Sequence, residues 1–329
     1  MFAKKPKTVD TNQLNERMEK YFLVKMPDDF FKFWSFCSSL NPLNPKAALH
    51  TLDLLLVGPF DVIDGKLKDE VLDSADPASI LCYYRFFYDV PEFQTVLRDT
   101  KSNFHIGYFR DSPSEMPSMV VSNDPDKSCI INPLGDNIFS GLLAFCEDLK
   151  RRRSEKDDKK ANAEKLSLKI KAYAEKNDIP LVNNNMKERK KKVVAKTFHG
   201  AGIVVPFEND VGYRPLPENE QNLKKLLKKI ADMPEEDRQR SKAYESLREI
   251  VNLTNLANDE CDFGMALELG IDLFCFGEEC YHRLVSFTLG TAYELLDRHQ
   301  FGTIIEAHLA NRRNEKLMKF SIKGGSTSA

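Results

Sequence analysis

Phe104-His105-Ile106-Gly107-Tyr108-Phe109 alternates along its length, and alternation with period two is typical of a β-strand. Two further apolar runs accompany it: Leu52 to Val57, which stops at Gly58-Pro59, and the short run Cys129-Ile130-Ile131. The stretch from Cys82 to Tyr88 is nearly all aromatic, and we interpret it as core of the same sheet. Short strands separated by turns predict a mostly antiparallel sheet.

Helical patterns lie on both sides of these strands. Apolar residues recur at every fourth position from Leu14 to Phe22, and Pro27 begins a second helix with two acids in its first turn. The segment from Asn137 to Lys150 closes the half as a helix. We therefore predict an α+β domain with a mostly antiparallel sheet over residues 10–150.

The second half of the chain has a different pattern. Residues 151–176 are highly charged and hold few large apolar side chains, so we interpret them as a solvated helical connector. Two apolar strands around His199-Gly200-Ala201-Gly202 predict a short β hairpin. The helices expected after Pro217 are Asn222 to Met233, Glu235 to Leu256, Phe263 to Phe276 and Tyr281 to Ala310. We predict a mainly helical α+β domain over residues 177–320 and a disordered tail over 321–329.

Composition excludes several classes of protein. The chain has 329 residues and is 42% apolar with 22 phenylalanines, which fits about two folded domains rather than a disordered chain. Lys+Arg of 48 against Asp+Glu of 50 gives no electrostatic reason for a nucleic-acid partner, so direct nucleic-acid binding is expected to be absent or weak. No apolar run approaches the ~20 residues of a membrane helix. Seven cysteines without a CxxC pair or a signal peptide indicate a reducing compartment, cytosol or nucleus.

Three motifs each have a structural and a functional interpretation. The turn His199 to Gly202 could cradle an anion, but it lacks the spacing of a P-loop or dinucleotide fingerprint, and a structural turn is favoured. Cys275, Cys280 and His282 could bind zinc, but a second cysteine pair is missing. The basic run Lys187 to Lys192 is either a solvated face, a nucleic-acid or chromatin contact, or a nuclear address.

The most unusual feature is an acidic window without cations. Between Val251 and His282 there is no lysine or arginine, and three acids crowd into Asn258-Asp259-Glu260-Cys261-Asp262. Dense carboxylates repel one another, which can produce a general base or a cation-binding patch. A solvated acidic loop is the alternative. The seven acids of the window are Asp259, Glu260, Asp262, Glu268, Asp272, Glu278 and Glu279.

A second polar segment presents an aromatic and a cation before prolines. It is Asp210-Val211-Gly212-Tyr213-Arg214-Pro215-Leu216-Pro217. The simple interpretation is an exposed hairpin end, but Arg214 could orient a neighbouring carboxylate through a bidentate pair. Since neither spot has a nucleotide-binding motif or a metal cage, the chain is expected to hold part of an active site.

These segments together resemble the histone PARylation factor family, which assists ADP-ribosylation in the DNA-damage response. The resemblance covers roughly Pro27 to Arg312 and several of its motifs are long enough to be specific. The matching segments are 193–202, 210–214, 257–262, Pro91-Glu92-Phe93-Gln94-Thr95, Gly107 to Pro113 and Glu306 to Arg312.

The resemblance implies an accessory factor that docks on the catalytic domain of a DNA-break-activated poly(ADP-ribose) polymerase and completes a joint active site. The polymerase would hold NAD, so no cofactor is expected on this chain, which would not be an enzyme alone. It would supply Glu260 as the general base that directs ADP-ribosylation to serine on histones and other proteins. Asp259, Cys261 and Asp262 would line the polymerase contact, and Tyr213 and Arg214 would position Glu260 and touch the partner.

The resemblance also implies a nuclear protein, monomeric alone and recruited to chromatin at DNA damage sites. Two other classes of function stay open from the residues. One is a stand-alone hydrolase that uses paired carboxylates, which would need its own substrate pocket. The other is a chromatin-binding adaptor without a catalytic role, in which Glu260 would have no chemical function.

Overall fold

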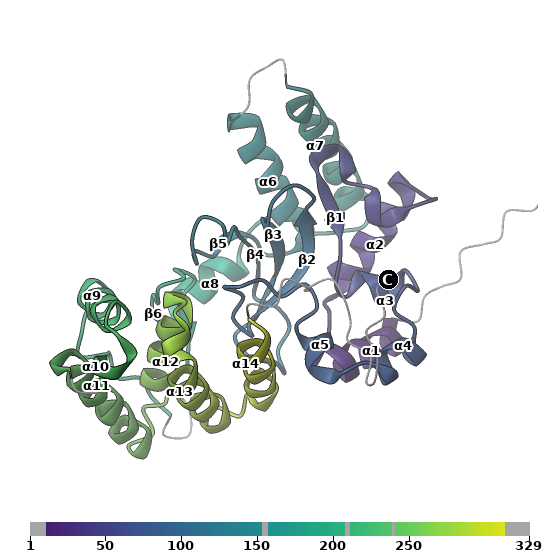
Figure 1. The fold of residues 1–329 in the computed structure, drawn as a ribbon. Helices are drawn as coiled ribbons and strands as arrows, with labels where there is room; N and C mark the ends of the chain where they lie inside the picture. Colours follow the sequence, from purple (N-terminus) through teal and green to yellow (C-terminus); the bar gives the residue numbers. More distant parts are fainter. Residues whose placement is uncertain (1–10, 153–156, 208–210, 239–240, 313–329) are drawn as a thin grey trace, which may run out of the picture.

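The structure is a computed structural model that describes residues 11–152, 157–207, 211–238 and 241–312 (Figure 1). The tail predicted over 321–329 and Asp210 of the second polar segment lie outside these residues. The predicted domain boundaries stay predictions. Within the described ranges, no helix combines the length and the apolar character needed to cross a bilayer.

The first half forms the predicted α+β arrangement around one antiparallel sheet. Its strands follow the chain order, and every neighbouring pair is antiparallel. The strands are β1 (Leu54–Leu56), β2 (Phe93–Asp99), β3 (His105–Phe109), β4 (Met119–Asn123) and β5 (Asn132–Gly135). The helices are α1 (Thr11–Phe22), α2 (Asp28–Leu40), α3 (Phe60–Ile63), α4 (Asp69–Ser74), α5 (Pro77–Leu81), α6 (Ile138–Arg152) and α7 (Asp158–Lys176), with short 3₁₀ turns at Pro45–Ala47 and His50–Leu52.

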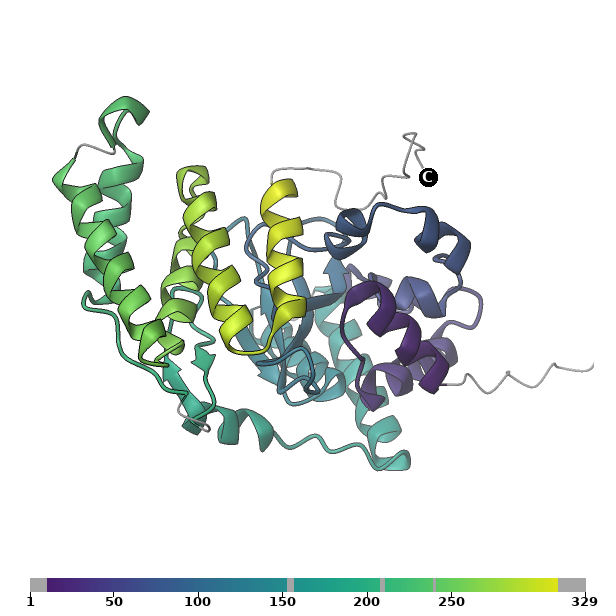
Figure 2. The ribbon, with the colours of Figure 1, turned by 90° about the horizontal axis from the view of Figure 1, so that it is seen from below.

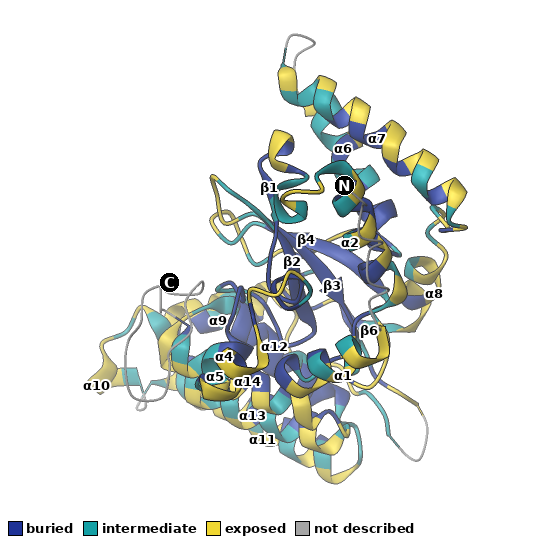
Figure 3. Ribbon diagram, turned by 90° about the vertical axis from the view of Figure 1, so that its right-hand side faces the viewer, coloured by how far each residue is buried: buried dark blue, intermediate teal, exposed yellow. Residues whose placement is uncertain are grey.

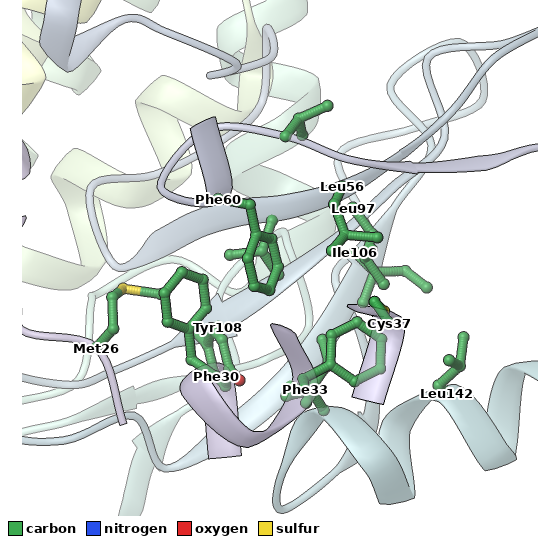
Figure 4. Packing of buried hydrophobic residues seen from close by; sticks show 14 of the residues in the cluster. Met26, Phe30, Phe33, Cys37, Leu56, Phe60, Leu97, Ile106, Tyr108 and Leu142 are labelled. Atoms are coloured by element: carbon green, nitrogen blue, oxygen red, sulfur yellow. The ribbon is translucent and has the colours of Figure 1, made fainter. Parts of the chain in front are cut away.

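An aromatic cluster holds the helices of this half to one face of the sheet. Phe30 of α2 stacks on Phe60 at a centroid distance of 4.1 Å, and Phe33 meets Phe139 of α6 edge to face at 5.4 Å. Figure 4 shows Phe30, Phe33 and Phe60 converging with Tyr108 and with aliphatic residues of β1 to β3. Aromatic pairs in these geometries contribute roughly 0.5–1.5 kcal/mol each beyond the apolar area they bury.

The opposite face of the same sheet belongs to a second core. On β4, Val120 joins the first cluster, whereas Met119 and Val121 join the second. This follows from the alternation of side chains across a strand. The second cluster is completed by helices from the C-terminal half of the chain, so both halves bury apolar side chains on one sheet. The sheet is dark blue at the centre of the molecule in Figure 3.

The predicted solvated connector is in fact packed along one side. Helices α6 and α7 lie side by side and project from the sheet (Figure 1). Ala163, Leu166 and Ile170 of α7 are buried in the first core, and Leu168 on the outer side is exposed. These few apolar residues form a buried stripe along one side of an otherwise charged helix, and the composition of the segment did not indicate it.

The second half contains the predicted hairpin followed by helices. The hairpin pairs β6 (Val193–Ala195) with β7 (Ile203–Val204), and it follows α8 (Asn185–Lys192). The helices are α9 (Glu220–Ala231), α10 (Glu235–Arg238), α11 (Lys242–Asp259), α12 (Gly264–Phe276), α13 (His282–Leu295) and α14 (His299–Asn311), with a 3₁₀ turn at Glu279–Tyr281. From α11 to α14 each helix contacts the next, and they stand in a row from green to yellow in Figure 2.

Two predicted elements have different boundaries. The single helix expected from Tyr281 to Ala310 breaks between α13 and α14, where Asp297 has a left-handed φ of 57°. Arg298 is buried beside this break and donates to the carbonyl oxygen of Val204 at 2.9 Å. The single helix expected from Glu235 to Leu256 is two helices: α10 ends at Arg238, and α11 starts at Lys242 after its N-cap Ser241. Helix α11 then continues to Asp259, which moves the acidic segment onto a helix end.

Two predicted strand segments are wrong. The aromatic stretch Cys82 to Tyr88 forms turns after α5 and not a strand, although most of it is buried. Side chains satisfy two of its backbone groups: the N–H of Phe86 donates to Oδ2 of Asp89, and Nε of Arg312 donates to the carbonyl oxygen of Phe87, both at 2.9 Å. The run Cys129 to Ile131 lies before β5 and is not a strand. The side-chain amide of Asn123 donates to the carbonyl oxygen of Ile130 at 2.9 Å, where a strand would have a ladder hydrogen bond.

The basic run Lys187 to Lys192 is only partly a solvated face. Arg189 lies buried within α8, and its guanidinium pairs with Asp111 at 2.7 Å. The same side chain donates to the carbonyl oxygens of Ala201 and Gly202 at 2.6 and 2.9 Å. A buried arginine with all these partners ties the hairpin turn to the sheet of the first half.

Candidate functional site

The acidic segment forms the C-terminal cap of α11. The N–H of Cys261 donates to the carbonyl oxygen of Asn258 at 3.0 Å, and the N–H of Asp262 donates to that of Ala257 at 2.8 Å. These two bonds are the pattern of a Schellman cap, which requires a left-handed residue after the helix. Cys261 is that residue, with a φ of 64°. A non-glycine residue in this conformation costs roughly 1–2 kcal/mol, so the cap is strained.

The cap determines where the candidate carboxylates lie. Glu260 is the last residue before the reversal, and its side chain is 62% exposed. Asp262 follows the reversal, with a side chain that is 24% exposed. The chain reversal at Cys261 therefore sets Glu260 and Asp262 close enough to share one cation.

The second polar segment is fastened to this cap through its backbone. The N–H of Gly212 donates to the carbonyl oxygen of Cys261 at 2.8 Å, and the N–H of Gly264 donates to that of Gly212 at 3.2 Å. A Cβ at position 212 would lie 2.5 Å from Oδ1 of Asp262. A side chain at position 212 would displace the Asp262 carboxylate, so the glycine before Tyr213 and Arg214 lets the loop lie against this carboxylate.

Arg214 joins the two carboxylates. Its Nη2 contacts Oε2 of Glu260 and lies 2.8 Å from Oδ2 of Asp262. These contacts run from one nitrogen to two carboxylates, in place of the expected bidentate pair with one. The Arg214 side chain is itself 45% exposed, so Glu260 is held in a defined position at the surface while staying accessible.

Tyr213 points to a different acid. Its hydroxyl donates to Oε2 of Glu268 on α12 at 2.9 Å, and its ring lies 2.9 Å from where a Cβ on Gly264 would be. Burial, together with the Glu268 carboxylate, raises the pKa of Tyr213, and burial raises the pKa of Glu268. In the sequence, Glu268 is only one of the seven acids of the window. It lies one turn into α12, and its hydrogen bond identifies it as the partner of Tyr213.

The structure thus brings together four of the six predicted site residues through backbone or side-chain contacts. They are Arg214, Glu260, Cys261 and Asp262, whereas the hydroxyl of Tyr213 bonds to Glu268 instead. Asp259, the sixth, is the last residue of α11 and is exposed. Leu253 and Leu256, two turns and one turn before Glu260 in α11, are 39% and 55% exposed. A positioned carboxylate on an open surface with exposed apolar residues nearby resembles one side of an interface.

Comparison with known proteins gives one consistent result. The family model of Histone PARylation factor 1 matches residues 13–312. Histone PARylation factor 1 of Danio rerio is 45% identical over 319 residues, covering 95% of this chain and 90% of the relative. The mouse protein of the same name, from Mus musculus, is 43% identical over 315 residues, covering 93% of this chain and 89% of the relative. The chain therefore belongs to the histone PARylation factor 1 family.

Proposed function

We propose that this chain binds the catalytic domain of a DNA-break-activated poly(ADP-ribose) polymerase and completes a joint active site for serine ADP-ribosylation. The observation that carries the proposal is the position of Glu260, exposed at the end of α11 and oriented by Arg214. A carboxylate that is 62% exposed has no closed pocket of its own, which suits a site completed by another protein.

In this proposal Glu260 is the general base. A serine hydroxyl is a poor nucleophile, and its oxygen becomes reactive as the Glu260 carboxylate accepts its proton. That oxygen then bonds to the ribose carbon of NAD, which the polymerase binds, while the bond from that carbon to nicotinamide breaks. A positioned base contributes roughly 100- to 10,000-fold to such a step.

The remaining site residues would serve the interface. Asp262 and Asp259 present negative charge beside Glu260, and Leu256 adds exposed apolar surface. A histone tail is rich in lysine, so the acidic window would attract it electrostatically near the substrate serine. This role places the protein in the nucleus, on chromatin at DNA damage sites, as a monomer when it is not bound to the polymerase.

The decisive experiment measures transfer of ADP-ribose to a histone peptide with a single serine. The polymerase, NAD and broken DNA are combined with the parent chain, with Glu260→Gln or with Glu260→Ala. We expect both variants to lose serine modification by at least about 100-fold, the lower end of a base's contribution, while calorimetry shows polymerase binding largely retained. Glu278→Gln is the matched control, because it removes another exposed carboxylate of the same window beyond the far end of α12.

Each competing function predicts a different result. An adaptor without a catalytic role would support serine modification equally well with Glu260→Gln. A stand-alone hydrolase would act without the polymerase, and that activity would depend on Glu260. Unchanged modification by Glu260→Gln, with parent-like binding, would refute the base assignment.

A further inference from the structure

Two cysteines from distant parts of the sequence meet beneath the hairpin turn. Cys129 lies in the segment between β4 and β5, and Cys275 lies near the end of α12. Cys275 is buried in the second core, Cys129 packs against the same core, and the two thiols interact. Both are free thiols, Cys129 partly exposed and Cys275 buried.

Contacts around Phe198 fix this juxtaposition from both sides. The Cys129 thiol also donates to the carbonyl oxygen of Phe198 at 3.6 Å. The N–H of Phe198 donates to Oδ1 of Asp272 at 2.7 Å, and Asp272 is one helical turn before Cys275. One residue of the hairpin turn therefore holds the Cys129 segment and α12 together.

The two sulfurs have opposite chemical environments. The hydrogen bond from Cys275 lowers the pKa of Cys129, and the nearby Lys224 ammonium lowers it further. Burial raises the pKa of Cys275 well above its ordinary value. A partly exposed thiol with thiolate character reacts first with an oxidant, and a buried neighbouring thiol can then resolve the product.

We propose that Cys129 and Cys275 form a peroxide-sensitive dithiol that closes to a disulfide between the two halves of the chain. The Cys129 thiolate attacks hydrogen peroxide, so that an S–O bond forms, the O–O bond breaks, and the leaving hydroxide takes a proton to become water. The Cys275 sulfur then attacks the Cys129 sulfur. The S–S bond forms, the S–O bond breaks, and the hydroxyl leaves as a second water with the Cys275 proton. Two thiols are oxidised and one peroxide is reduced to two waters.

The test is peptide mapping of the folded, full-length chain after a brief treatment with hydrogen peroxide. Free thiols are blocked before digestion without reductant, and the peptides are identified by mass. We expect a peptide that joins Cys129 to Cys275, lighter than the sum of its parts by two hydrogen atoms and lost on reduction with dithiothreitol. The exposed Cys280 should be alkylated as in the untreated protein at the peroxide concentration that gives half-maximal cross-linking.

Variants separate the attacking thiol from the resolving one. With Cys275→Ser the cross-linked peptide should be absent, and a dimedone-type probe should label Cys129 as its sulfenic acid. With Cys129→Ser, a change at a partly exposed position, Cys275 should stay reduced, because burial keeps peroxide away. Cys280→Ser is the matched control and should cross-link like the parent.

Either of two results would overturn the proposal. Cys129 and Cys275 could both stay reduced at peroxide concentrations that oxidise Cys280, which would show an unreactive pair. Cys129 could also cross-link to a different cysteine in the intact chain, which would show that Cys275 is not its partner. The readout needs neither the polymerase nor NAD, so it is independent of the proposed function.

Discussion

Replacing Arg214 with alanine tests whether one cation organises the site. The change removes the contacts of Nη2 with Glu260 and Asp262, whose side chains are 62% and 24% exposed. Solvent screens pairs of this kind, so they contribute little to folding. The backbone bonds between Gly212 and the Cys261 cap do not involve the removed side chain. We therefore expect the thermal unfolding transition of Arg214→Ala to stay close to that of the parent.

Serine modification should respond very differently. Without the guanidinium, nothing described in the structure fixes the Glu260 carboxylate, and rotation about its side-chain bonds moves it by more than an ångström. A displacement of about 1 Å can reduce the rate of an oriented reaction on the order of 100-fold. The loss should not exceed that of Glu260→Gln, which removes the base altogether. Arg214→Lys should give an intermediate rate, because an ammonium keeps the charge but not the guanidinium geometry.

The assay compares three measurements on the same preparations: initial rates of histone-peptide modification, polymerase affinity by calorimetry, and thermal unfolding by circular dichroism. Lys225→Ala on α9 is the control for loss of an exposed cation. We expect Arg214→Ala to lose rate and some affinity without losing stability. A parent-like rate, measured with the variant at a concentration that saturates the polymerase, would show that Arg214 does not position Glu260. A loss of rate accompanied by an equal loss of thermal stability would show only a structural role.

Cys261→Gly should raise the free energy of unfolding by up to roughly 1–2 kcal/mol, because it relieves the left-handed strain; denaturant unfolding measures this change. Initial rates should show that serine modification is retained, unless the thiol itself contacts the polymerase. Asp262→Lys places a cation beside Arg214 and should weaken polymerase binding at least about tenfold, with the loss persisting at high salt if docking buries the residue; a loss that disappears in salt would place Asp262 at the rim. Burial raises the pKa of Glu92 to about 7 from an ordinary 4.5, so its contribution to stability is full below about pH 4.5 and is lost as pH rises through 7. Glu92→Gln should remove that dependence, worth ~3 kcal/mol, and a parent-like slope of unfolding free energy against pH would contradict the buried, protonated state.

The sequence predicted well those elements whose local chemistry agrees with their tertiary role. The antiparallel sheet, the hairpin around His199 and the helix closing the first half are all present. The misassigned elements depend on distant partners. The break at Asp297 is accompanied by burial of Arg298 against Val204, and the turn at Phe87 accepts a hydrogen bond from Arg312, 225 residues further along the chain. Hydrophobic periodicity in the sequence does not show where a side chain takes the place of a backbone hydrogen bond of the sheet.

The candidate site was predicted as residues but not as geometry. The grouping of Glu260 with Asp262 and Arg214 follows from the Schellman cap, and a cysteine in the position usual for glycine hides that cap in the sequence. Glu268 was one of seven acids until α12 placed it under Tyr213. The sequence indicated which residue types form the site, and the chain reversal at Cys261 determines which of these residues are in contact.

The sheet that both cores share also restricts where this protein can be cut. A fragment ending at residue 176 would keep all five strands but would expose Phe93, Phe109 and Val121 to water. A fragment starting there would lose the surface on which its own helices rest. Both fragments would expose large apolar surfaces and tend to aggregate. Crystallisation or tethering designs that use the C-terminal half should therefore include the whole sheet.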